Sequence, residues 1–260
     1  MLGLLPTVLS LVGPTTIETG MLALRRPLLA QLIAASCPSI SVIRTINYRD
    51  GEEMLQVREA ARPNEKSFVK SWPTTLMVLQ YPLLLGCIGN LVYTVWELSR
   101  NTICTLSSQT AWLPLFWIMI ALPIHWVGFV TVRMRVRLDN KRSAGDRHNH
   151  VVEKQPSAWA AMLKNEFRLG IDHPPDSGEL KMRVEHWRFS ILSWVASTGS
   201  VLHLIFGTII LSSILFTTPR DSTNVIGRLL LSVLVSRAIL AGELYGMRSS
   251  IVVSKDVVDQ

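Results

Sequence analysis

Three stretches of the sequence run for more than twenty residues without an Asp, Glu, Lys or Arg: residues 74–96, 111–132 and 190–216. Crossing the hydrocarbon core of a bilayer takes roughly 20 mostly apolar residues in a helix. A fourth stretch, residues 225–246, is long enough but contains Arg237 and Glu243. The sequence therefore predicts an all-α integral membrane protein with four transmembrane helices and, before them, a membrane-associated hydrophobic region.

The composition supports a membrane environment. Charged residues make up 17% of the 260 residues, against about 25% in ordinary soluble domains. The mean hydropathy is +0.31. The three cysteines form no CxxC pair, which argues against a cysteine-based zinc site or a disulfide framework.

The distribution of basic residues predicts the topology. The short polar connections between spans one and two and between spans three and four hold only Arg100 and Arg220, so these spans form two hairpins. Twenty Lys and Arg lie in the segment before the first span, the central loop and the tail. The positive-inside rule places these three segments in the cytoplasm. The predicted order is a basic segment (44–73), hairpin 1 (74–132), a basic loop (133–189), hairpin 2 (190–246) and a cytoplasmic tail (247–260).

The net charge of +7 is explained by this topology and does not require nucleic acid as a partner. Basic segments beside a membrane are attracted to anionic lipid headgroups. Within the central loop, residues 157–169 have apolar side chains at helical spacing, which is typical of a helix on the membrane surface. A helix that docks a membrane-protein partner is the alternative.

The first 43 residues are apolar but broken. The stretch "MLGLLPTVLSLVG" is short and is followed directly by Pro14, and "PLLAQLIAASCPSISVI" contains Pro38. They are compatible with a re-entrant hairpin, an interfacial pair or one further span, and also with a start inside a longer hydrophobic segment.

The run "LPTVLSLVGPTTIETGMLALRRPLLAQLIAASCPSI" resembles uncharacterised multi-pass membrane proteins of filamentous fungi. This resemblance implies a class of protein and brings no known activity or catalytic residue with it.

The ionisable residues of the fourth span are the first candidate site. An Arg near the centre of a span costs about 2.5 to 3.5 kcal/mol on insertion scales, and such residues usually face the bundle interior. Six positions separate Arg237 from Glu243, so they do not share a helix face. We expect Arg237 to meet His203, Gln80 or a hydroxyl such as that of Ser200, and Glu243 to reach the cytoplasmic headgroups.

Two histidines lie inside spans, His125 in the second and His203 in the third. Interhelical hydrogen bonding is the usual role of such residues. A haem held by both imidazoles is a less favoured hypothesis.

Other chemistry has little support in the sequence. The groups Asp146, His148, His150 and Asp172, His173, Asp176 match no established zinc or di-iron spacing, so no metal is predicted. The chain has no phosphate-binding loop and no hydrolase elbow, which argues against an enzyme and gives no cofactor.

Small residues predict where helices approach closely. They recur on the third span at Ser193, Ser197, Ser200 and Gly207, and on the fourth span at Ala238, Gly242 and Gly246.

These features favour a non-enzymatic scaffold or accessory subunit. The alternatives are a small transporter or channel component that uses Arg237, Glu243 and His203, and a haem-binding electron-transfer protein that uses His125 and His203.

Overall fold

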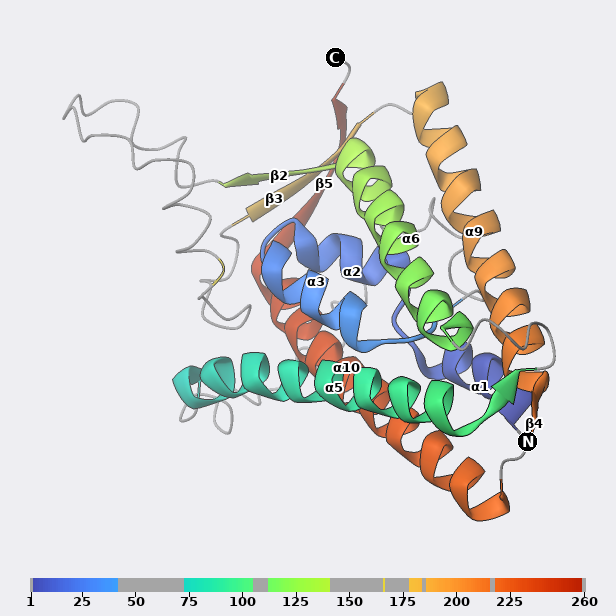
Figure 1. Cartoon of the computed structure of the whole chain (residues 1–260). Coiled ribbons are helices and arrows are strands. Elements are labelled where there is room, and N and C mark those ends of the chain that lie inside the picture. The colour runs from blue at the N-terminus through green and yellow to red at the C-terminus, as the bar shows by residue number, and fades with distance from the viewer. Residues whose placement is uncertain are drawn as a thin grey trace.

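Four long helices dominate the computed structural model, which describes residues 2–41, 73–104, 112–140, 166, 178–183, 186–215 and 218–258. They are α5 (Pro73–Asn101), α6 (Leu113–Arg135), α9 (Trp187–Ser212) and α10 (Pro219–Ser250). All four are long and apolar enough to cross a membrane. The predicted fold class, an all-α membrane protein with four spanning helices, is therefore confirmed (Figure 1).

The fourth helix begins earlier than the sequence pattern predicts. Its start, Pro219, lies in what was expected to be the polar connection. The Thr218 hydroxyl accepts a hydrogen bond from the Asp221 amide at 3.2 Å and contacts the Asp221 carboxylate at 2.6 Å. A capping Thr followed by Pro at the first helical position and by an acidic residue is a strong helix start, even where the local composition is polar.

Short strands tie the helices together at both ends of the bundle. At one end, β1 (Ile103–Cys104) pairs with β4 (Ile214–Leu215), so the predicted third span ends as a helix at Ser212 and continues as a strand. At the other end, β2 (Val136–Asn140) is antiparallel to β3 (Gly178–Arg183), which is parallel to β5 (Ile251–Val258). The end of α6 and the start of α9 thus lie close together, and β5 runs up to them from the end of α10, which lies beside the far ends of β2 and β3 (Figure 1).

The N-terminal region consists of short elements that lie among the long helices (Figure 1). They are the 3-10 turn η1 (Leu2–Leu4) and the helices α1 (Leu5–Val12), α2 (Thr16–Ala23) and α3 (Pro27–Ser36). Helix α2 packs against α6, and α3 packs against both α2 and α5. Which of the three expected arrangements this region adopts in a bilayer stays a prediction. Because α2 and α3 pack between the long helices, we call them the re-entrant hairpin.

Turn residues and caps explain why these helices are short. Gly13 and Pro14 separate α1 from α2, and Pro27 occupies the first position of α3. At Gly13 an added Cβ would lie 2.9 Å from the carbonyl oxygens of both Leu9 and Ser39. Only glycine lets the chain after α3 return this close to the end of α1.

Two apolar clusters form the core, one toward each end of the bundle. One cluster surrounds the re-entrant hairpin and includes Val132 of α6, Phe189 of α9 and Leu240 of α10. The second surrounds η1 and α1 and includes Trp117 and Ile210. The N-terminal region, in which α2 is buried along its whole length, therefore fills the inside of the bundle except for outward-facing residues such as Leu4 and Leu11. The long helices form the outer wall.

Candidate intramembrane polar core

Arg237 forms an ion pair with Glu18 of α2, so its partner comes from the re-entrant hairpin. Its two guanidinium nitrogens reach the two carboxylate oxygens, with Nη2 2.9 Å from Oε1. The expected acceptors were wrong, because Ser200 donates to the Ala196 carbonyl and His203 bonds to Trp117. The inward direction expected for Arg237 agrees with the structure.

The same Glu18 carboxylate also stabilises the start of α2. Its Oε2 atom accepts a hydrogen bond from the Thr15 amide at 3.1 Å, while the Thr15 hydroxyl accepts one from the Glu18 amide at 3.0 Å. This reciprocal pattern is a capping box, and it satisfies two amides that a helix start would otherwise leave unpaired. A single carboxylate thereby orients α2 and neutralises Arg237.

Glu243 lies inside the bundle, which contradicts the expectation that it reaches the headgroups. Its side chain is 1% exposed and its Oε1 atom lies 2.6 Å from Nη1 of Arg26, which is 2% exposed. Gln80 of α5 completes the group, since its Nε2 donates to Glu243 at 2.7 Å and its Oε1 accepts from Arg26 at 3.1 Å. Gln80 therefore accepts a hydrogen bond from Arg26, and not from Arg237 as expected.

The two ion pairs have opposite polarity. Helix α10 supplies the cation at Arg237 and the anion at Glu243, and the N-terminal region supplies the matching Glu18 and Arg26. Buried charges are costly unless they are paired and hydrogen-bonded. Two complementary pairs fix both the position and the direction of the re-entrant hairpin along α10.

A residue of the central loop joins this group. The Glu166 side chain is fully buried, and its carboxylate accepts hydrogen bonds from the first amides of α3. Sequence reasoning missed Glu18, Arg26 and Glu166 because none of them lies in a predicted span. An acidic residue three positions after Thr15 was the one available signal for Glu18.

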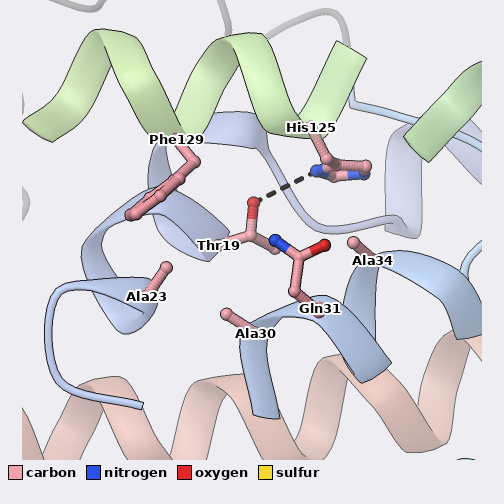
Figure 2. Close-up of a pocket in the computed structure, with 7 residues that line it drawn as sticks. All are labelled: Thr19, Ala23, Ala30, Gln31, Ala34, His125 and Phe129. Atoms are coloured by element: carbon pink, nitrogen blue, oxygen red, sulfur yellow. Dashed lines mark hydrogen bonds between the residues drawn. The ribbon is translucent and has the colours of Figure 1, made fainter. Parts of the chain in front are cut away.

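His125 lines a small pocket between α2, α3 and α6 (Figure 2). Its Nδ1 atom lies 3.1 Å from the Thr19 hydroxyl, which also contacts the carbonyls of Thr15 and Thr16. Its Nε2 atom is buried and has no hydrogen-bond partner among the residues that the structure describes. The side chains of Ala23, Ala30 and Ala34 make the rest of the wall mostly apolar.

His203 is held by Trp117 of α6. Its Nε2 lies 2.9 Å from the Trp117 carbonyl, and the Trp117 indole N–H donates to the His203 carbonyl at 3.1 Å. The two rings stack with centroids 5.4 Å apart. A carbonyl only accepts, so Nε2 of His203 carries the proton and is committed to this bond.

The geometry does not favour shared haem ligation by the two histidines. His203 is absent from the wall of the pocket that His125 lines, and its Nε2 is occupied by the Trp117 carbonyl. Both residues instead hold neighbouring segments together, which is the usual role of intramembrane histidines.

The predicted packing residues fall into two groups. At Gly207 an added Cβ would overlap the Trp117 indole, and Ser200 is fully buried, so these residues lie in the contact between α9 and α6. Ser193 and Ser197 are half-buried and Gly246 is buried. By contrast, Ala238 is exposed, and an added Cβ at Gly242 would meet no atom of the described residues within 4 Å.

Several predicted features lie outside the described residues: the basic segment 44–72, the surface helix 157–169 apart from Glu166, and the acidic and histidine groups at 146–150 and 172–176. Among the residues that are described, no group of three or more His, Cys, Asp or Glu is placed to hold a metal ion.

Comparison with known proteins gives no relative: no family model, no curated protein and no solved structure matches the chain.

Proposed function

We propose that the chain is a non-enzymatic scaffold or accessory subunit of a membrane, whose intramembrane charges serve its own assembly. The observation that carries this proposal is the pairing of Arg237 with Glu18 and of Arg26 with Glu243. A transporter needs charged groups that are free to bind a substrate, whereas these four bind one another. The outer wall of four apolar helices is then available to lipid and to a membrane-protein partner.

The test is co-purification in mild detergent, combined with the uncharged double variant Glu18→Gln/Arg237→Leu, in which the new amide side chain can still accept the hydrogen bond from the Thr15 amide. Replacing both members of a buried ion pair by uncharged residues is often neutral or stabilising. We expect the folded double variant to retain the proteins that co-purify with the original chain. Loss of those proteins from a folded double variant would show that the pair does more than hold the fold.

A small transporter or channel component is the second candidate, because the α2 and α3 helices begin inside the bundle. Helix starts buried at membrane depth are typical of ion and substrate sites in transporters. Proton flux into liposomes, reported by an entrapped pH-sensitive dye, separates the two candidates. Flux that exceeds that of protein-free liposomes and disappears in the double variant would replace the scaffold proposal by this one.

We also propose that the end carrying β2, β3 and β5 faces the cytoplasm and its anionic lipid headgroups. The support is the charge census, with twenty Lys and Arg in the segments assigned to that side and two in the opposite connections. Cys104, in β1 at the other end, should react with an impermeant maleimide only from the non-cytoplasmic side. Cys37 and Cys87 are buried and serve as internal controls. Labelling of Cys104 from the cytoplasmic side would show that the proposed orientation is wrong and that the chain is inserted the other way round.

A further inference from the structure

The start of α3 receives a carboxylate from a distant part of the chain. Glu166 Oε1 accepts a hydrogen bond from the Leu29 amide at 2.7 Å, and Oε2 accepts one from the Leu28 amide at 3.2 Å. These amides belong to the first turn of a helix, where no carbonyl of the same helix can pair with them. In sequence, 137 and 138 residues separate Glu166 from its two amide donors.

The backbone of Glu166 is bound as well. Its carbonyl accepts a hydrogen bond from Nε of Arg26 at 2.8 Å, and the Tyr81 hydroxyl lies 3.0 Å from the Glu166 carboxylate. Arg26 in turn donates to the Tyr81 hydroxyl at 3.3 Å. The side chain and the main chain of one residue are thus bound by α3, by the turn before it and by α5.

The charges explain why a carboxylate suits this position. Arg26 already pairs with Glu243, so it cannot alone neutralise a second carboxylate. The start of a helix carries a positive potential equivalent to roughly half an elementary charge. The start of α3 supplies the missing attraction, and Glu166 supplies the acceptors that its buried amides lack. The buried start of α3 and the buried Glu166 carboxylate therefore stabilise each other.

We propose that Glu166 is a latch that couples the central loop to the re-entrant hairpin. While the carboxylate is docked, the loop is attached to the bundle and the start of α3 is ordered. When a partner that binds the loop withdraws Glu166, the Leu28 and Leu29 amides lose their acceptors and the start of α3 loosens. Through this contact, binding of a partner to the loop changes the order of α3 inside the bundle. This proposal does not depend on the proposed scaffold function.

The experiment is hydrogen exchange of the full-length protein in nanodiscs, comparing the original chain with Glu166→Gln. This change keeps the shape of the side chain and removes its charge and one acceptor oxygen. We expect the Leu28 and Leu29 amides to exchange at least about tenfold faster, because both lose their hydrogen bond to a charged group. Unchanged exchange at Leu28 and Leu29 in the folded variant would overturn the latch.

The matched control is Glu153→Gln, which removes the same charge from the same loop. We expect it to leave the exchange of the Leu28 and Leu29 amides unchanged; equal acceleration in this control would also overturn the proposal. If Glu166→Gln does not fold, Tyr81→Phe removes one hydroxyl contact to the latch. It should then accelerate exchange of the Leu28 and Leu29 amides by a smaller factor, and no change in them would refute the coupling.

Discussion

The N-terminal region and the four long helices have similar apolar character but face different surroundings. Leu9, Leu22 and Ile33 of the short helices are fully buried, whereas Val78, Leu202 and Leu231 of the long helices are 60 to 65% exposed. In a bilayer the exposed leucines and valines contact lipid tails, which are as apolar as the protein interior, so their exposure carries no hydrophobic cost. The comparison shows that hydropathy predicts entry into the membrane but does not distinguish protein-facing from lipid-facing segments.

Polar content separates the two regions better than apolar content does. The short helices begin and end inside the bundle, and backbone at membrane depth must find partners within the protein. They find them through Thr15 and Glu18 at the start of α2, and through Glu166 at the start of α3. A region whose helix starts are capped by buried carboxylates, its own Glu18 and Glu166 of the central loop, is therefore expected to be internal.

The largest effect is expected from breaking the most buried ion pair. Removing one partner of such a pair costs about 3 to 5 kcal/mol, because an unpaired charge remains inside. Arg26→Ala and Glu243→Ala should each lower the free energy of unfolding by this amount, measured by reversible unfolding in SDS. The double variant Arg26→Met/Glu243→Leu should recover only part of the loss, because Arg26 also donates to the Glu166 carbonyl and to Gln80. If either single change costs under about 1 kcal/mol, the inner region is not held by this pair.

The sequence alone predicted the outer wall well. Uncharged runs identified three of the four spanning helices, and an apolar run that contains Arg237 and Glu243 identified the fourth, because a helix that crosses a bilayer must be mostly apolar. Arg237 was correctly expected to point inward, yet its acceptor was sought only within other spans. Glu18 lay in a segment for which three arrangements were open, and hydropathy could not choose among them.

The error at Glu243 has a physical cause in helix length. The pattern ended the fourth span at residue 246, which would put Glu243 one turn from the end. Helix α10 continues to Ser250, so Glu243 lies about 10 Å of helix before its end. The four residues after the apolar run, of which only Arg248 is charged, extend the helix beyond the stretch whose composition marks a span. Depth estimates from hydropathy therefore fail most at span ends.

A medium effect is expected from filling the contact between α6 and α9. Gly207→Ala places a methyl group where the Trp117 indole lies, so the two helices must separate or the indole must move. Overpacking of this kind costs about 1 to 3 kcal/mol. The same unfolding measurement should show this loss, accompanied by a change in tryptophan fluorescence.

Gly242→Ala is the matched control on the outer wall. Nothing in the described part of the chain lies within 4 Å of the added methyl group. Its free energy of unfolding should change by less than about 0.5 kcal/mol, as for surface substitutions in general. A large loss at Gly242 in the purified protein would mean that this face is covered, and would break the division between inner filling and outer wall.

Among the ion pairs, the smallest loss of unfolding free energy is expected at the pair formed by Arg228 of α10 and Glu97 of α5. It has the same chemistry as the buried pairs and the same 2.6 Å separation as Arg26 and Glu243, but each of its side chains is 40% exposed. Solvent screens such a pair, so Arg228→Ala should cost less than about 1 kcal/mol. Part of that loss comes from the Tyr93 ring, which lies 5.4 Å from the guanidinium carbon.

This last pair tests burial directly, since the ion types and the distance are held constant. Raising the salt concentration should remove most of the Arg228 contribution while leaving the Arg26 contribution nearly intact, because buried pairs are screened much less. Unfolding of the two alanine variants at low and high salt measures both values. Equal losses for Arg228→Ala and Arg26→Ala would mean that separation alone sets the strength of these pairs. A larger loss at Arg26, insensitive to salt, would show that the same two side chains stabilise the filling of the bundle far more than its wall.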